Sequence, residues 1–216
     1  STSYFFINAF NVFLVPSISF LGSVGYTATF SKNLPVLSKI ATLHPVLNPG
    51  SNPKDMEFFQ QVKKLNLKNS RLCAFGSTRR KGMQCIEDSN LQSLLAAETE
   101  DVVFFGKSWD FQVTDIIRTS LEENLEMIYD TAAFLKKNGR NVIYDAEHFF
   151  TAFEKNREYA MKTLQAAVDG GASVLALCET KGGCVLNECA EATKDVVKMF
   201  GDKAIIGIHT HNDSGL

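Results

Sequence analysis

The sequence predicts an α/β protein built as an incomplete (β/α)8 TIM barrel with parallel strands, in which the first and last strands are missing or aberrant. Two observations support this fold class. From about residue 50 onward, apolar runs of four to six residues alternate with single helical segments, which implies right-handed βαβ crossovers and a buried parallel sheet. In addition, polar and reactive side chains follow each apolar run, as expected at the carboxyl ends of barrel strands.

Residues 1–47 differ in composition from the rest of the chain, and the first 31 residues carry no charged side chain. A membrane anchor is not expected, because Asn8, Asn11 and Pro16 interrupt the apolar run, and a transit peptide would be rich in Arg. We therefore expect an aberrant or poorly ordered segment at 1–47, with a vestigial strand near 36–43, and a partial TIM-barrel domain at 48–216.

The first regular elements follow a turn cluster at residues 48–53. Asp55 is expected to cap a helix whose apolar residues, from Phe58 to Leu65, recur at helical spacing. Residues 71–75 then form a short apolar strand that ends in the polar loop 76–82.

Beyond residue 82 the same alternation continues, with polar or Gly-rich turns bounding each element. The expected strands are residues 101–106, 141–145, 173–178 and 204–210. The expected helices are one capped near Asp88 or Ser89, one over about 113–137, one over 154–169 ended by Gly170 and Gly171, and one over 187–200 ended by Gly201. Single helices between strands predict that the five strands lie side by side in chain order.

A doubly wound open sheet is the competing architecture. Such a nucleotide-binding fold is expected to carry a Gly-rich fingerprint after its first strand, and the sequence contains neither Gly-x-Gly-x-x-Gly nor a P-loop. The barrel, which gathers reactive residues from several strand ends, agrees better with this sequence.

The composition indicates which partners and which cellular compartment to expect. The formal net charge of −2, with short and scattered basic clusters, gives no electrostatic footprint for nucleic acid. Five cysteines at spacings that fit neither a zinc ribbon nor a disulfide scaffold favour free thiols in a reducing compartment, the cytoplasm or an organelle. Cys184 and Cys189 are read as small buried side chains, with a role beside a metal as the alternative.

Two histidines mark the end of the last apolar run. Side chains alternate faces along a strand, so His209 and His211 are expected to point the same way, about 6.6 Å apart along the strand. One divalent ion can take both imidazoles, whereas on a helix this pair would point to nearly opposite sides. The alternative is a pair of ordinary polar residues at a strand end.

Five stretches together resemble the citramalate synthase branch of the metal-dependent Claisen-condensing barrels, a superfamily that includes 2-isopropylmalate synthase, homocitrate synthase and hydroxymethylglutaryl-CoA lyase. The stretches are Phe-Gly-Ser-Thr-Arg-Arg-Lys-Gly at 75–82, Phe-Gly-Lys-Ser-Trp-Asp-Phe at 105–111, Tyr-Asp-Ala-Glu-His-Phe-Phe at 144–150, Leu-Cys-Glu-Thr-Lys-Gly-Gly at 177–183 and Gly-Ile-His-Thr-His-Asn-Asp at 207–213. The resemblance implies an acyltransferase that condenses acetyl-CoA with a small 2-oxo acid such as pyruvate, in isoleucine biosynthesis, with a divalent Mg, Mn or Zn ion.

The resemblance also implies roles for particular residues. His209 and His211 would be metal ligands, Glu147 the base, Thr180 and Tyr144 substrate contacts, and His148 an aid to proton transfer. Arg79 and Arg80 would hold an anionic substrate or the CoA phosphate. The alternatives are that Glu147 is a solvated loop carboxylate and that both arginines are surface residues. For His148 the alternative is packing against the barrel rim, and this interpretation is favoured.

Two departures from the family pattern limit the implied function. The sequence contains no Asp-x-Thr-Leu-Arg-Asp-Gly segment, which in the family supplies an Arg and a metal-binding Asp, and no counterpart of the eighth strand. A complete barrel needs eight strands and about 250 residues, so the chain is expected to be a fragment with impaired activity. The alternatives are a 2-isopropylmalate or homocitrate synthase-like enzyme, lyase-type retro-aldol chemistry and a non-catalytic barrel remnant. The intact family implies a homodimer and no membrane.

Overall fold

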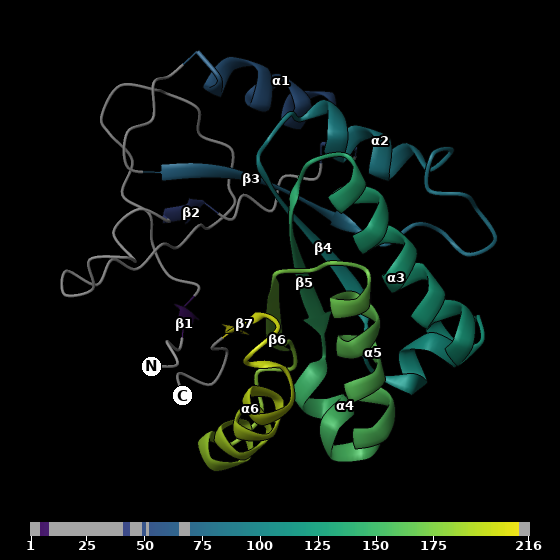
Figure 1. The fold of residues 1–216 in the computed structure, drawn as a ribbon, viewed down its shortest axis with the longest axis vertical. Coiled ribbons are helices and arrows are strands. Elements are labelled where there is room, and N and C mark those ends of the chain that lie inside the picture. The colour runs from purple at the N-terminus through teal and green to yellow at the C-terminus, as the bar shows by residue number, and fades with distance from the viewer. Residues whose placement is uncertain (1–4, 9–40, 44–48, 51, 65–69, 212–216) are drawn as a thin grey trace.

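The computed structural model describes residues 5–8, 41–43, 49–50, 52–64 and 70–211 (Figure 1). The described strands form one seven-stranded sheet in the order β1-β7-β6-β5-β4-β3-β2, and every neighbouring pair is parallel. The strands are β1 (Phe5–Asn8), β2 (Ala41–Leu43), β3 (Ser70–Ser77), β4 (Asp101–Lys107), β5 (Asn141–Glu147), β6 (Val174–Glu179) and β7 (Ile205–Thr210). The helices are α1 (Pro53–Val62), α2 (Ser89–Ala96), the π-helical turn η2 (Gln112–Ile116), α3 (Leu121–Lys137), α4 (Phe149–Lys155), α5 (Arg157–Asp169) and α6 (Leu186–Phe200).

The five predicted strands, β3 to β7, lie side by side in chain order, which confirms the α/β barrel-type topology. The vestigial strand expected near 36–43 appears as β2, which pairs with β3. β1 was not predicted; it pairs with β7 and aligns Ile7 with His209. The expected domain boundary at 47/48 lies outside the described residues. Among the described strands, β1 and β2 are the two edges, so the sheet is not closed.

Three helix boundaries differ from those predicted. Asn52 caps α1 in place of Asp55, because its side chain accepts the Lys54 backbone N–H and Pro53 occupies the first helical turn. The single helix expected over 113–137 is divided into η2 and α3, and Ser120 caps the latter. The helix expected over 154–169 is likewise two helices, α4 and α5, separated at Asn156, which caps α5.

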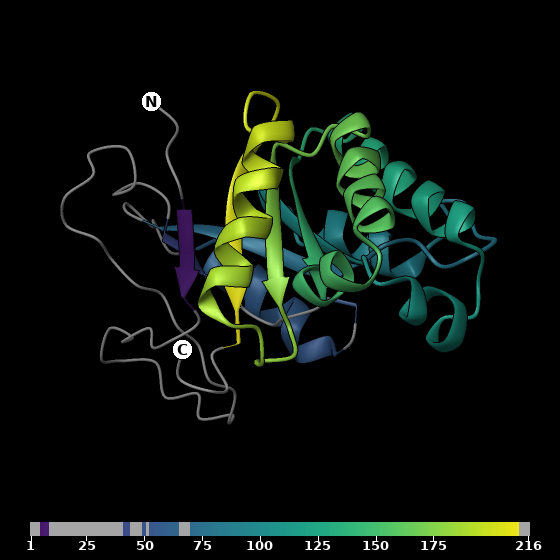
Figure 2. The same ribbon diagram turned by 90° about the horizontal axis from the view of Figure 1, so that it is seen from below.

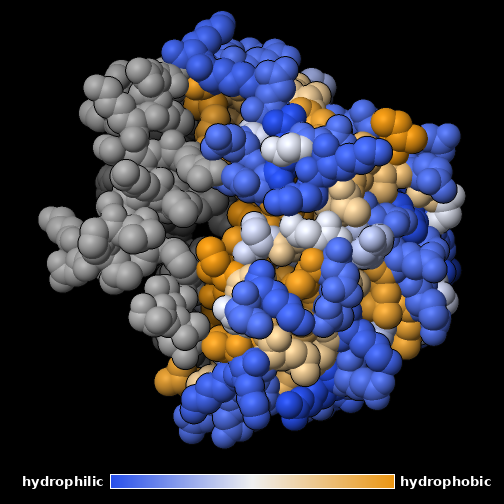
Figure 3. Space-filling model, viewed as in Figure 1, coloured by the Kyte–Doolittle hydropathy of each residue, from blue (hydrophilic) through white to orange (hydrophobic). Residues whose placement is uncertain are grey.

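The helices run in an arc around the outside of the sheet, from α1 and α2 through α3 and α5 to α6 (Figures 1 and 2). Alternate residues of the strands face these helices and form the main core. Phe104, Tyr144 and Leu177 belong to it, together with Ile128 of α3 and Leu164 of α5. The helix surfaces seen in Figure 3 are mainly hydrophilic, with hydrophobic residues between them. The remaining strand residues therefore point to the opposite face of the sheet, the side that a barrel encloses.

Among the described residues, no helix is both long enough and apolar enough to cross a membrane.

Candidate metal centre

The face of the sheet opposite the helices carries a row of polar side chains near the carboxyl ends of β5, β6 and β7. Because strand residues alternate, Asp145 and Glu147 of β5 share this face and Tyr144 does not. The register of β6 with β7 pairs Cys178 with His209. The rings of His209 and His211 have centroids 5.3 Å apart, inclined by 30°. The strand geometry therefore places the two histidines on one side, as their spacing indicates.

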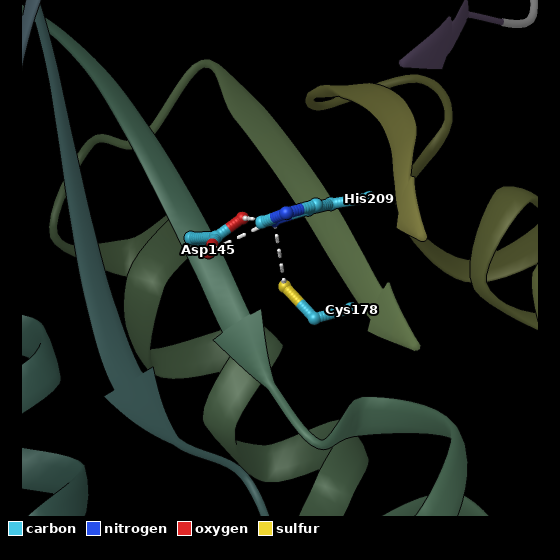
Figure 4. Close-up of side chains that lie close together, drawn as sticks. All are labelled: Asp145, Cys178 and His209. Atoms are coloured by element: carbon cyan, nitrogen blue, oxygen red, sulfur yellow. Dashed lines mark hydrogen bonds and ion pairs between the residues drawn. The ribbon is translucent and has the colours of Figure 1, made fainter. Parts of the chain in front are cut away.

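Asp145, Cys178 and His209 point toward one another from three adjacent strands (Figure 4). The Asp145 carboxylate oxygens lie 3.1 and 3.3 Å from His209 Nδ1, and Cys178 Sγ lies 3.7 Å from the same nitrogen. The three offer ligand atoms within 4.8 Å of one another, which is close enough for a metal ion. Two of them, Asp145 and Cys178, are almost fully buried.

Burial and the buried carboxylate shift the pKa values of this cluster. Burial lowers the pKa of His209, but the hydrogen bond to Asp145 and its negative charge outweigh burial and raise the pKa overall. Burial and the nearby Asp145 charge hold the pKa of the Cys178 thiol well above its ordinary value, so this cysteine is a neutral thiol.

Glu147, His148 and Thr180 form the rim next to this cluster. Lys107 Nζ lies 2.5 Å from a Glu147 carboxylate oxygen, and both side chains are about one fifth exposed, at 19% and 22%. The His148 backbone N–H donates to Thr180 Oγ1 at 2.9 Å. His148 has a left-handed backbone with φ of 56°, its ring lies 6.0 Å from that of Trp109, and burial lowers its pKa. Left-handed backbone in a non-glycine residue is a feature that clusters at functional sites.

Tyr144 was predicted to line the substrate pocket, but the structure places it on the helix-facing side of β5. The side chain is fully buried, its ring packs 5.2 Å from that of Phe104, and its hydroxyl is 3.2 Å from Ser108 Oγ. Burial raises its pKa. Tyr144 lies between Ile143 and Asp145 in the alternation of β5, so its side chain points away from His209.

The two arginines predicted to bind an anion are committed to internal ion pairs. Arg79 is 6% exposed and pairs with Glu123 at 2.8 Å and Asp130 at 2.9 Å, both on α3. Arg80 is exposed and pairs with the buried Asp88 at 3.3 Å. Their positions support a structural role in fixing the loop after β3 rather than the predicted anion contact.

Cys184 and Cys189 lie on the helix side of the sheet, apart from the cluster around His209. Cys184 lines a pocket of about 260 Å³ between α4 and α6, together with Glu179 and Lys181. The Cys184 thiol lies 3.6 Å from the Val185 carbonyl oxygen and 3.8 Å from a Glu188 carboxylate oxygen, and burial raises the pKa of both cysteines. Both side chains are half-buried, whereas the sequence reading expected them to be buried.

Sequence reasoning missed Asp145, Cys178 and Lys107. Asp145 is two residues before Glu147, and this spacing alone places both carboxylates on one face of a strand. Cys178 and Lys107 gave no comparable signal, because their contacts depend on the register of neighbouring strands, which the sequence does not display.

The parallel strands, the outer helices and the polar residues at the strands' carboxyl ends define a protein of the βα-barrel class. The family can be stated as well: the model of the HMGL-like family matches residues 45–216, so the chain belongs to that family.

Several known proteins are similar to this chain. Over 77% of its length the chain is 53% identical to the (R)-citramalate synthase of Aquifex aeolicus, and 50% identical to that of Sulfolobus acidocaldarius, covering 31% and 32% of those proteins. Identity to the 2-isopropylmalate synthase of Vibrio parahaemolyticus is 30%, with 78% of this chain and 32% of that protein covered. The chain thus spans about a third of the length of these relatives.

Solved structures of hydroxymethylglutaryl-CoA lyases share the fold. The enzyme from Bacillus subtilis aligns with a TM-score of 0.58 at 15% identity, covering 76% of this chain and 54% of that one. The enzyme from Pseudomonas aeruginosa aligns with a TM-score of 0.56 at 14% identity, covering 77% and 55%. At such low identity this likeness concerns the fold alone.

Proposed function

We propose that the chain carries part of the catalytic barrel of an acyl-CoA condensing enzyme of the (R)-citramalate synthase type. The observation that carries this proposal is the 53% identity to a citramalate synthase over 166 residues. The family model in turn matches residues 45–216, which include the whole strand-end cluster. The lower identity to a 2-isopropylmalate synthase, 30%, favours pyruvate over a bulkier 2-oxo acid. The homodimer expected of the intact family and the division at residue 48 are part of the same proposal.

In the proposed reaction, a base removes a methyl proton from acetyl-CoA, the resulting enolate attacks the ketone of pyruvate, and hydrolysis of the thioester releases CoA. Glu147 is the proposed base. Its carboxylate lies at the rim and is partly exposed, at 22%, so a substrate can reach it. The Lys107 ammonium group forms an ion pair with this carboxylate and holds it at the rim.

His209 and His211 are the proposed ligands of a divalent ion. Two imidazoles on one side of a strand end, with centroids 5.3 Å apart, are a donor pair that suits Mn²⁺ or Zn²⁺ better than Mg²⁺. An ion held there would supply Lewis-acid stabilisation of the negative charge that develops on the ketone oxygen. Thr180 accepts the His148 N–H and keeps its own hydroxyl proton, which can be donated to the substrate carboxylate.

The test replaces the matching segment of the Aquifex aeolicus (R)-citramalate synthase with residues of this chain, which leaves the relative's remaining segments in place. We expect the chimera to release CoA from acetyl-CoA in the presence of pyruvate, as measured with a thiol reagent. Glu147→Gln in the chimera should lower kcat by about 100-fold or more, because general-base catalysis contributes that much.

The matched control is Glu154→Gln, which removes one exposed carboxylate on α4 and should leave the rate unchanged. A folded chimera that binds acetyl-CoA but releases no CoA with any 2-oxo acid would contradict the proposal. CoA release with a larger 2-oxo acid and none with pyruvate would contradict only the assignment of the substrate.

A further inference from the structure

Asp145 lies directly against the ring of His209. Its carboxylate oxygens are 3.1 and 3.3 Å from His209 Nδ1, although β6 separates the two strands in the sheet. The Asp145 side chain is 5% exposed and that of His209 is 23% exposed. A carboxylate this deeply buried needs hydrogen-bond donors that compensate for its lost hydration. The contact therefore restricts the orientation of both the Asp145 carboxylate and the His209 ring.

The contact fixes the position of a proton. An ionised carboxylate only accepts hydrogen bonds, and a neutral imidazole carries a proton on one nitrogen and a lone pair on the other. If Nδ1 held the lone pair, two acceptors would face each other at 3.1 Å, which is repulsive. Nδ1 therefore holds the proton and donates it to Asp145, and the lone pair of the neutral ring is on Nε2.

Cys178 completes the arrangement. Its Sγ lies 3.7 Å from His209 Nδ1, but that nitrogen is already a donor to the carboxylate. The Cys178 thiol lies within 4.8 Å of the Asp145 carboxylate, and burial and the Asp145 charge raise its pKa, so it stays neutral there. Cys178 therefore packs beside the Asp145–His209 pair and does not replace Asp145 as the acceptor of the Nδ1 proton.

We propose that Asp145 is a positioning residue, which holds the His209 ring in the orientation and tautomer that present Nε2 to a divalent ion. This inference rests on the proposed function, in which His209 is a metal ligand. A carboxylate that accepts the second N–H of a ligating histidine both orients the ring and raises its basicity, and its loss typically lowers metal affinity by about 10- to 100-fold.

The first measurement needs no metal. Two-dimensional ¹H–¹⁵N spectra of the histidine rings at alkaline pH, where the imidazole is neutral, distinguish the two tautomers. We expect His209 to be protonated at Nδ1 in the unmodified chain, and Asp145→Ala to shift it toward the Nε2-protonated form. An Nε2-protonated ring in the unmodified chain would overturn the proposal, even if no Asp145 variant folds.

The second measurement is Mn²⁺ affinity, determined by electron paramagnetic resonance of the free ion. Asp145→Ala should weaken binding about 10- to 100-fold and Asp145→Asn less, because the amide oxygen still accepts the N–H. Glu154→Gln, which removes an exposed carboxylate on α4, is the control and should leave the affinity unchanged. Unchanged affinity in Asp145→Ala would overturn the proposal.

Two further outcomes separate this proposal from the proposed function. The metal role of the histidines is wrong if His211→Ala binds Mn²⁺ as tightly as the unmodified chain, or if the unmodified chain binds no Mn²⁺. In either case the tautomer of His209 still tests the Asp145–His209 contact. If Co²⁺ gives a thiolate-to-cobalt absorption band that Cys178→Ala removes, the cluster itself ligates the ion through Nδ1, and the positioning role is overturned.

Discussion

At the scale of single residues, Arg79 shows how a buried charge can organise a loop. The Arg79 guanidinium group forms ion pairs with the carboxylates of Glu123 and Asp130. The Arg79 backbone N–H donates to Thr131 Oγ1 at 2.9 Å. All three partners belong to α3, so one residue ties the loop after β3 to this helix. The planar, permanently charged side chain suits a pairing with two carboxylates.

We expect Arg79→Ala to lower the free energy of unfolding by about 2–3 kcal/mol, because it leaves two carboxylates without their buried partner. This value is at the lower end for a buried pair, since Asp130 is 44% exposed and water compensates part of the loss. Arg80→Ala is the matched control: that side chain is 59% exposed, and its loss should change stability by less than about 1 kcal/mol. Urea unfolding measures both, and equal effects would contradict the structural role of Arg79.

The residue scale also shows where sequence reasoning reached its limit. The alternation rule placed His209 and His211 on one face, and the same rule applied to β5 would have selected Asp145 with Glu147 and excluded Tyr144. That part of the site was predictable. The pairing of Asp145 with His209 was not, because it requires the register of two strands relative to β6.

At the scale of elements, Asp88 begins α2. Its carboxylate accepts the backbone N–H groups of Arg80, Asn90 and Leu91 at 2.9, 2.9 and 3.2 Å, and the side chain is fully buried. Burial by itself raises the pKa of Asp88, but these three hydrogen bonds and the Arg80 charge together outweigh it and lower the pKa below its ordinary value of 3.8.

A lowered folded-state pKa makes this cap sensitive to acid. Its contribution to stability is complete above the ordinary value of 3.8 and is lost as the pH falls through the lower pKa of the folded state. Asp88→Asn should cost about 1–2 kcal/mol at neutral pH, and its difference from the unmodified chain should shrink as the pH falls below 3.8. Urea unfolding across this range measures the difference, with the exposed Glu87→Gln as the control for net charge. A difference that does not depend on pH would contradict this account.

Gly170, at the end of α5, allows close packing against α3. A Cβ atom there would lie 2.6 Å from Ala132 Cβ and 2.6 Å from the Tyr129 carbonyl oxygen, and backbone cannot yield easily. Gly170→Ala should therefore lower the free energy of unfolding by about 1–3 kcal/mol, as overpacking does. Gly183→Ala, where an added Cβ meets nothing within 4 Å, is the matched control and should be nearly neutral. Thermal unfolding compares the two, and similar melting temperatures would contradict the packing argument.

Most elements could be predicted because short apolar runs and turn residues bound them. The start of α3 was missed although Ser120, followed by Glu123 three residues later, is a capping-box pattern, and the Ser120 hydroxyl does accept the Glu123 N–H at 3.0 Å. β1 could not be predicted, because its pairing with β7 joins opposite ends of the chain and leaves no local pattern.

At the scale of the whole molecule, metal binding at the end of β7 is expected to change the free energy of unfolding. β7 lies between β6 and the edge strand β1. His209 belongs to β7, and His211 directly follows its last residue, Thr210. An ion that binds the folded state and not the unfolded chain stabilises the fold by mass action. The same histidines can therefore be tested without any enzymatic activity.

We expect Mn²⁺ at 100 times its dissociation constant to raise the free energy of unfolding by about 2.7 kcal/mol, and a chelator to reverse the effect. Mg²⁺ at the same concentration should stabilise less, because imidazole nitrogen is a poorer ligand for it. His211→Ala is the decisive variant: His211 is exposed, so its loss should leave the metal-free stability unchanged while it reduces the Mn²⁺-dependent increase. Denaturant unfolding with and without each ion gives both quantities. An increase of the same size in His211→Ala would show that Mn²⁺ binds elsewhere, and that the two histidines do not form the centre assigned to them.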